Sequence, residues 1–560
     1  MTTVQPQFLI CNNSSFANKL FNLLIITILT VSLQITAFGQ QPYNVPFNHS
    51  FSHQDKYLYQ YGSNFHTSVK PYLKSETDTI VDIDSILRIP FDSRLMNWVF
   101  NNHFIKYDKK GVQFTIDPAC NFEIGKGDSS KVSWINTRGV IVRGALGNDF
   151  AFGTSFYENQ ARFFDYRENA VRENRVWDKE KYYVVPGQSV AKPFKETGWD
   201  YYYSDAYISY STPKYFNIQF GTGKHFFGDG YRSLLLSDNS MNYPYLKITT
   251  DFWRIKYVNL WAQFQDIGSG KPDIDPRDKK WGAFQYLDWN VCDWLTVSLF
   301  EAIIWADKDS KGNHRGFDIS YANPIIFLHP VEWNLGSPDN LLVGIAGKIT
   351  IPEKTALYGQ FILNEFKFKE LTAGNGWYGN KWGVQAGIKS YDIFQLKNLF
   401  LQTEINAVRP FMYSHMNKVI NYTHLGQPLA HPYGANFIES VSFLRYRYQR
   451  AFLELGFNYI LHGRDSADAN FGNNLFYNYT KKHSEYGNNF GQHEKVNVSS
   501  TTATVSYLIN PKYNMNIYLG LNNRIEKSNS VTENRKLIVF GLRCSLQNHY
   551  WEYRTTPVKK

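Results

Sequence analysis

Cysteine is scarce in this chain, which has only four among its 560 residues: Cys11, Cys120, Cys292 and Cys544. Cys11 precedes an apolar run near the amino terminus, and the other three are far apart and odd in number. Zinc ligands occur at closer spacing, and a disulfide-stabilised scaffold needs a denser, even set. The sequence therefore indicates neither a disulfide framework nor a metal site, and it calls for no cofactor.

Long apolar runs are also absent, with one exception at the amino terminus. The run Leu20–Ala37 ends in small residues, and Ala37 and Gly39 match the pattern of signal-peptidase cleavage before Gln40. A transmembrane anchor is the alternative, because the run could just span a bilayer, but no basic stop-transfer flank follows it. We therefore expect residues 1–39 to be an export signal and exclude a helical membrane protein for the remainder.

The chain also lacks a long run of one charge sign, although its net charge is +10. Its Lys and Arg residues are scattered among Asp, Glu and Tyr, which argues against nucleic-acid binding. We interpret them as charges of a barrel lumen, of loops and of surfaces that face outer-membrane lipid and lipopolysaccharide. Acidic surface polysaccharide is then the expected anionic partner.

Aromatic residues, in contrast, are abundant: the chain has 39 Tyr, 42 Phe and 14 Trp. The mean hydropathy is nevertheless only −0.40. A large membrane barrel combines these properties, because its lipid face and aromatic girdles are apolar while its lumen and loops are polar. A soluble β-protein of several domains is the alternative, given that the chain exceeds the usual size of one soluble core.

Alternation of apolar and polar residues dominates from about Val112 onward, as in Phe216–Phe220, Leu453–Tyr459 and Tyr513–Asn522. One face of each segment carries Leu, Ile, Phe or Tyr, and the other carries mainly glycine and amides. Lipid accepts the first face, and a water-facing lumen accepts the second. The pattern predicts an all-β fold: a transmembrane antiparallel outer-membrane β-barrel of about 18 strands, spanning residues 111–548.

Connections between the predicted strands are of two kinds. Tight turns are expected at Ile351–Lys354, Gln449–Ala451 and Ile509–Asn514. Longer polar loops are expected at Arg162–Gly198, Asp266–Lys280, Gly374–Lys381 and Asp465–Glu494. Short turns at one end and long loops at the other are typical of outer-membrane barrels.

The segments that flank the barrel differ in character. Residues 40–110 are predicted to be a periplasmic lead-in, and residues 549–560 a short C-terminal tail. Within the lead-in, Arg94–Ile105 is predicted to be helical, with apolar residues at helical spacing: Leu95, Trp98, Val99 and Ile105. We expect this stripe to pack under or inside the barrel.

The stretch Gly223–Tyr245 (GKHFFGDGYRSLLLSDNSMNYPY) combines residue types suited to sugar binding. Gly228 and Gly230 permit a sharp turn and close approach of the backbone. Aromatic faces can stack on pyranose rings, and carboxylates and amides can bind hydroxyls. The candidate ligand-binding residues are Phe227, Asp229, Tyr231, Arg232, Asp238, Asn239 and Tyr243. The structural alternative is an inward-folded loop held by Arg232 and Asp238.

Two chemical alternatives are weak. His225, Asp229, Ser237 and Asp238 supply the residue types of a hydrolase, but no nucleophile elbow surrounds Ser237. We therefore expect a non-enzymatic protein without catalytic residues. The segment Asp307–Gly312 (DKDSKG) has Lys where a calcium loop needs an oxygen ligand and lacks its closing Glu, so no metal is expected.

Four ordered motifs carry a resemblance to a known family. They are Gly223–Tyr245, Asn323–Asn340, Tyr358–Lys367 and Gln427–Phe437. With them the chain resembles the Wzi-like capsule-assembly outer-membrane proteins, and most closely the branch that includes the gliding-motility protein RemB. One departure is Phe227-Gly228-Asp229-Gly230, which stands where enterobacterial members have a W-G-P-G turn.

The resemblance implies a barrel that associates capsule or other surface polysaccharide with the cell surface. Three alternatives remain open at this point. The same barrel could serve gliding motility or surface adhesion through other envelope proteins, it could be a porin or transport barrel, or it could be a barrel hydrolase.

Overall fold

The structure, a computed structural model, describes residues 42–551 with short gaps. The gaps are residue 52, 62–63, 129–130, 174, 178–181, 213–214, 267–277, 310, 328–338, 352–353, 467–468 and 530–531. The predicted export signal and most of the Asn323–Asn340 motif lie outside the described residues.

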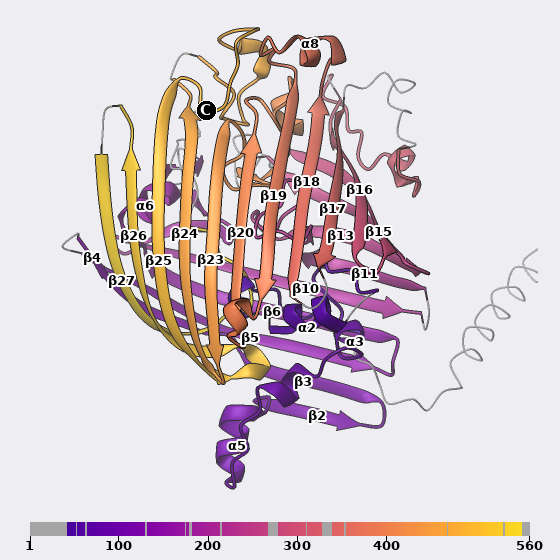
Figure 1. The fold of residues 1–560 in the computed structure, drawn as a ribbon, viewed down its shortest axis with the longest axis vertical. Helices are drawn as coiled ribbons and strands as arrows, with labels where there is room; N and C mark the ends of the chain where they lie inside the picture. The colour runs from indigo at the N-terminus through magenta and orange to yellow at the C-terminus, as the bar shows by residue number, and fades with distance from the viewer. Residues whose placement is uncertain are drawn as a thin grey trace, which may run out of the picture. The chain divides into compact units, whose positions relative to one another are not determined.

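Eighteen antiparallel strands form a closed barrel, as the alternation predicted. Neighbours in sequence are neighbours in the ring, and pairing of the last strand with the first closes it (Figure 1). The strands are β4 (Asn121–Gly127), β5 (Val132–Leu146), β6 (Phe150–Arg162), β10 (Gly198–Ser211), β11 (Phe216–Gly223), β13 (Tyr243–Phe252), β14 (Ile255–Gln265), β15 (Lys279–Cys292), β16 (Leu295–Ala306), β17 (Asn340–Ile351), β18 (Thr355–Glu365), β19 (Lys381–Tyr391), β20 (Leu399–Val408), β23 (Phe437–Tyr448), β24 (Ala451–Arg464), β25 (Glu494–Asn510), β26 (Met515–Lys527) and β27 (Thr532–Cys544).

The described residues also form shorter strands and helices besides the eighteen barrel strands. The strands are β1 (Val69–Lys70), β2 (Ile105–Lys109), β3 (Val112–Pro118), β7 (Arg175–Trp177), β8 (Tyr182–Val185), β9 (Ser189–Phe194), β12 (Phe226–Phe227), β21 (Thr423–His424) and β22 (Gln427–Pro428). The helices are α2 (His53–Tyr61), α3 (Lys74–Thr77), α4 (Ile83–Ile86), α5 (Arg94–Asn101), α6 (Asp165–Glu173) and α8 (Phe368–Ala373), besides six short 3-10 turns. Within the described part, none of these helices has the length and apolar character needed to cross a membrane.

The two faces of the strands differ as the alternation predicted. On β11 the Phe220 side chain is 62% exposed, whereas the neighbouring Gln219 is fully buried. On β24, Leu455 is 41% exposed and Asn458 is buried. Large apolar side chains therefore point outward, where lipid surrounds a membrane barrel, and amides point inward.

The connections also follow the prediction, with short turns at one end and long loops at the other. Residues 163–197, between β6 and β10, carry α6 and a small sheet of β7–β9. At the opposite end, two residues connect β23 to β24. One detail differs: Tyr513 was expected to begin a lipid-facing strand, but it lies buried in the 3-10 turn Pro511–Tyr513, and β26 begins at Met515.

The main hydrophobic core lies inside the barrel. The buried cluster includes Leu234, Leu235 and Leu236, together with inward-facing aromatic residues of the wall such as Tyr286 and Phe300. Glycine and amides were expected on the luminal face. That expectation holds on β11 and β24, but β14–β16 present apolar side chains inward because other segments of the chain cover them.

Part of the predicted lead-in lies inside the barrel. His66 contacts Asp288 of β15 at 2.7 Å, and Lys348 of β17 donates to Thr67 at 2.6 Å. β1 pairs with β12. Polar partners on the inner wall thus hold the segment, which local sequence could not reveal.

The predicted helix is present as α5, but its apolar stripe is not packed as expected. Leu95 is 65% exposed, and Trp98 and Ile105 are also exposed. The helix sits at the end with short turns (bottom of Figure 1), where Asn510 donates to the carbonyl of Val99 at 2.8 Å. Its polar backbone contacts, and not its apolar stripe, attach it to the barrel.

Candidate functional site

Residues 224–242, called here the inner loop, connect β11 to β13 and fold down into the lumen. They contain six of the seven residues predicted to bind sugar, and the seventh, Tyr243, begins β13 directly after them. All seven are buried. A turn at Gly228, with φ +131°, starts the descent, and only glycine adopts this conformation easily. A Cβ atom at Gly230 would collide with the carbonyl of Arg232 and the carboxylate of Glu404, so the backbone approaches the wall closely there.

Asp229 lies at the bottom of the inner loop against the N-terminal segment. Its carboxylate accepts hydrogen bonds from Tyr59 and Thr67, each at 2.6 Å. Burial alone would raise the pKa of Asp229. The ammonium groups of Lys348, Lys70 and Lys389 outweigh that effect and hold the pKa well below its usual range. The carboxylate therefore stays charged inside the barrel.

Lys70 completes this contact from the N-terminal side. Its ammonium group donates to the carbonyl of Gly228 at 2.8 Å. Burial, followed by repulsion from Lys389, lowers the pKa of Lys70 to about 8, while Asp229 opposes that shift. The result is a buried network of opposite charges that ties the inner loop to β1.

Arg232 anchors the middle of the inner loop to the wall. Its guanidinium pairs with Glu439 of β23 at 3.1 Å and lies over the rings of Tyr231 and Tyr550. Glu439 also contacts His431 at 2.5 Å. The backbone N–H of Tyr231 donates to Glu404 of β20 at 2.8 Å. Glu404 and Glu439 thus bind the inner loop from two neighbouring strands.

The remaining predicted residues have partners inside the protein. Phe227 stacks on Tyr286 at 4.7 Å with nearly parallel rings. Asp238 accepts hydrogen bonds from Asn548 and Tyr550, each at 2.8 Å. The side-chain amide of Asn239 donates to the carbonyl of Pro428 at 3.1 Å. Tyr243 packs edge-on against Phe264 at 4.9 Å.

The loop between β20 and β23 covers the inner loop from a different side. Tyr413 and Tyr422 donate to the carbonyls of Leu234 and Leu235, each at 2.7 Å. Ser237 donates to the carbonyl of Ala430 at 2.5 Å. Three other segments therefore meet the inner loop within the barrel: the N-terminal segment, residues 409–436 and the C-terminal residues 545–551.

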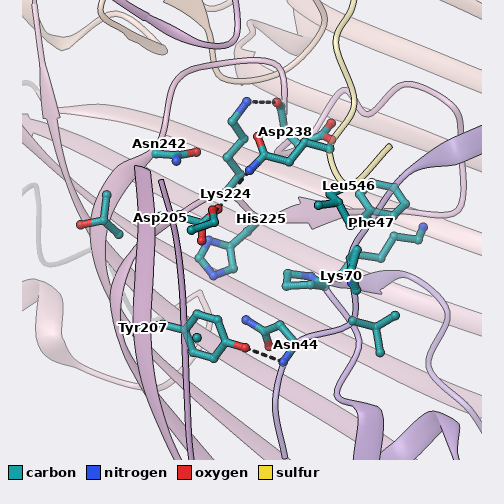
Figure 2. Close-up of a pocket in the computed structure, with 18 of the residues that line it drawn as sticks. Asn44, Phe47, Lys70, Asp205, Tyr207, Lys224, His225, Asp238, Asn242 and Leu546 are labelled. Carbon is teal, nitrogen blue, oxygen red and sulfur yellow. Dashed lines mark hydrogen bonds between the residues drawn. The ribbon is translucent and has the colours of Figure 1, made fainter. Parts of the chain in front are cut away.

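A cavity of about 140 Å³ remains beside the inner loop (Figure 2). Lys224 lines it and donates to the carbonyls of Gly187 at 2.6 Å and Asp238 at 3.2 Å, and burial lowers the pKa of Lys224 to about 8. Tyr207 accepts a hydrogen bond from the backbone of Asn44 at 2.8 Å. The volume holds several water molecules but is smaller than the roughly 300–1,000 Å³ of most ligand pockets.

The four residues considered for a hydrolase do not hydrogen-bond to one another in the described part of the chain. His225 contacts Tyr243 at 3.4 Å, while Ser237, Asp229 and Asp238 each bond to other partners. Within the described residues, no three His, Cys, Asp or Glu side chains gather to hold a metal ion. Asp309, in the segment considered as a calcium loop, accepts backbone hydrogen bonds from Lys311 and Asn313 and forms a surface turn.

Sequence reasoning missed the residues that hold the inner loop in place. Tyr59 and Thr67 belong to the predicted lead-in, and Tyr550 to the predicted C-terminal tail. One signal was available. Glu404 and Glu439 occupy luminal positions of strands in which apolar and polar residues alternate, and a carboxylate buried there needs a partner.

Comparison with solved structures agrees with the barrel. The chain is similar to Wzi, an outer-membrane protein of Escherichia coli involved in group 1 capsule assembly and described as a carbohydrate-binding β-barrel. The TM-score is 0.52 at 10% identity, over 90% of this chain and 100% of that one.

Two barrels from Pseudomonas aeruginosa are less similar. OprD has a TM-score of 0.40 at 9% identity over 77% of this chain and 94% of its own, and OccK8 (OprE) has 0.39 at 8% over 77% and 97%. These scores carry no argument about function. No protein-family model matches the chain, and a search of curated proteins finds no match either. The comparisons therefore show the fold alone.

Proposed function

We propose that this protein is a closed outer-membrane barrel that associates surface polysaccharide with the cell surface by binding, without catalysis. The observation that carries this proposal is the filled lumen. Within it, Asp229 of the inner loop accepts a hydrogen bond from Thr67, the backbone of Tyr231 donates to Glu404, and Arg232 pairs with Glu439. A barrel with its lumen occupied by its own chain is suited to binding at its ends and poorly suited to transport. The motifs of a Wzi-like protein, and the fold shared with a carbohydrate-binding β-barrel, support the same conclusion.

Glycan contact is proposed at the end with long loops. Aromatic rings are exposed there, on Phe366, Phe368 and Tyr486. α8, which carries Phe368, stands at this end (top of Figure 1). Exposed rings offer flat faces for sugar stacking, whereas the rings of the inner loop are already covered by protein.

Hydrogen bonds join two of the long loops, the one between β18 and β19 and the one between β24 and β25, and so hold their exposed rings in place. Backbone hydrogen bonds connect Gly487 to Asn375 and Asn488 to Gly376, each at 2.9 Å. The guanidinium of Arg409 donates to the carbonyl of Asn380 at 2.9 Å and to that of Asn488 at 3.1 Å. A surface ordered in this way loses less conformational entropy when a chain of sugars binds.

Deletion of the gene tests the proposal. Cells without the protein should lose retained capsule or extracellular glycan, and the wild-type gene should restore it. If glycan is retained while surface movement is impaired, the protein serves gliding motility or adhesion instead. Purified wild-type barrel that shows open conductance in planar bilayers would identify a porin.

A further inference from the structure

Cys120 and Cys544 lie side by side at the seam that closes the barrel. Their sulfur atoms are 3.7 Å apart, although 424 residues separate them in sequence. The backbone N–H of Cys544 donates to the carbonyl of Cys120 at 2.7 Å. Arg543 pairs with Asn121 in the last register of the β27–β4 ladder, so the two cysteines occupy the next opposed position.

This geometry is close to that of a disulfide. Opposed residues of antiparallel strands have Cα atoms about 4.5–5.5 Å apart, within the roughly 4.4–6.8 Å that disulfides span. The sulfurs, now 3.7 Å apart, must approach to about 2.05 Å for the bond to form. Cys292, the third cysteine that the structure describes, lies on β15 and has no cysteine beside it.

The seam differs from every other junction of the ring. Each other pair of neighbouring barrel strands is consecutive along the chain, whereas β27 and β4 are its last and first members. Their ladder has seven residue pairs, compared with thirteen between β26 and β27. The two cysteines lie at the end with short turns, where Ser545 bonds to the carbonyl of Asn514 at 3.1 Å.

We propose that Cys120 and Cys544 form a disulfide that links the first and last strands of the barrel. The inference rests on the proposed outer-membrane location, because the short-turn end then faces an oxidising compartment. The oxidant is a thiol–disulfide oxidoreductase in its disulfide form. The thiolate of Cys120, which is half-buried, attacks one sulfur of that disulfide and releases the other as a thiolate.

The second step completes the exchange. The thiolate of Cys544 attacks the Cys120 sulfur of the mixed disulfide, and the oxidant leaves with both of its sulfurs reduced. The two protons lost by the protein thiols are taken up by the oxidant thiolates. The product covalently closes the ring and leaves Cys292 as a free thiol.

Peptide mapping of the full-length protein tests this assignment. The protein is taken from outer membranes in the presence of an alkylating agent, denatured without reductant and digested. Among Cys120, Cys292 and Cys544, we expect alkylation at Cys292 alone, together with a peptide that links Cys120 to Cys544; reduction should release two further thiols. Alkylated Cys120 and Cys544 in the unreduced sample would overturn the proposal, as would a link to Cys292.

Gel mobility gives a second readout with matched variants. A link across 424 residues makes the denatured chain more compact, so the unreduced protein should migrate faster than the reduced protein. Cys292→Ser should keep this difference, and Cys120→Ser and Cys544→Ser should abolish it. Equal mobility of reduced and unreduced wild-type protein would contradict the link. Neither assay depends on glycan binding, so failure here and failure of the proposed function are distinguishable.

Discussion

Charged residues inside the barrel determine whether the inner loop stays docked. Asp229 accepts a hydrogen bond from Thr67, which in turn accepts one from Lys348, and Lys70 donates to the carbonyl of the adjacent Gly228. The pKa of Asp229 is lower in the folded state than in the unfolded chain. The group therefore stabilises the fold above its unfolded pKa of about 3.9, and this contribution is lost as pH falls through the lower, folded value.

We predict that Asp229→Asn destabilises the barrel by about 3–5 kcal/mol, the usual cost of removing one partner from a buried ion network. The lysine charges would remain buried with fewer partners. Urea unfolding followed by heat-dependent gel mobility measures the effect. Asp108→Asn is the control, because this carboxylate is exposed on β2 and pairs with Lys106 at the surface, so little change is expected. Equal stability of Asp229→Asn and wild type would show that the network does not hold the loop.

Substitution of aromatic residues distinguishes two possible locations of glycan contact, the outer loops and the inner loop. Phe368→Ala with Tyr486→Ala should reduce polysaccharide retention several-fold while barrel abundance stays normal, because both rings are exposed. Each sugar contact nets only about 0.5–1.5 kcal/mol, so the double variant is needed for a clear loss.

Tyr231→Ala, Asp238→Ala and Tyr243→Ala are the matching inner variants. Because they remove buried contacts, we expect them to lower barrel stability, by about 3–5 kcal/mol for a large aromatic side chain. The contrary outcome is a stably folded inner triple variant that loses glycan while the outer double variant keeps it. That result would assign ligand binding to the inner loop.

At the scale of strands and loops, the lipid surroundings of a barrel make its strands predictable from sequence. A strand in a bilayer must present apolar side chains outward, so the alternation in Leu453–Tyr459 revealed both the strand and its faces. The contacts of the inner loop could not be read in the same way. Asp229 meets Thr67 across 162 residues, and Asp238 meets Tyr550 across 312. Such pairs depend on the closed ring, which local pattern does not encode.

Substitution on opposite faces of one ladder tests the assignment of the lipid face. Leu455→Arg should impair insertion, because arginine near the bilayer midplane of a barrel costs about 2–4 kcal/mol. Thr504→Arg is the matched control, since Thr504 points inward next to Ala503, the partner of Leu455. Asn458 is on the luminal face but is a poor control, because its amide donates to the buried Glu439 at 2.6 Å. Equal insertion of both variants, judged by heat-dependent gel mobility, would refute the assignment.

Trypsin added to intact cells tests which end faces outward. Lys481 is exposed on the long loop between β24 and β25, whereas Lys512 lies in the short turn Pro511–Tyr513. We expect cleavage near Lys481 in intact cells, and cleavage at Lys512 only after the outer membrane is permeabilised. Replacing Lys481 and Lys482 by Ala should remove the first cut. Cleavage at Lys512 in sealed cells would reverse the orientation of the barrel.

For the whole molecule, the inner loop distinguishes a closed barrel from a channel. An eighteen-stranded ring is wide enough for an aqueous lumen. Here four segments of the same chain meet inside it, and apolar side chains of β14–β16 are buried against them. The interior has thus become the hydrophobic core of the protein, so opening it would expose apolar surface to water.

We therefore predict that purified wild-type barrel gives no open-channel conductance in planar bilayers, and that replacing residues 229–241 by a Gly/Ser linker of equal length produces it. The linker would remove both the Arg232–Glu439 pair and the Asp229 contacts, which hold the loop at its middle and its base. Replacing residues 368–376 in the same way changes only an outer loop and serves as the control. Heat-dependent gel mobility must first show that both variants are folded. Steady conductance of the wild-type protein would show that the lumen is open despite these contacts, and it would favour a porin over a glycan-binding barrel.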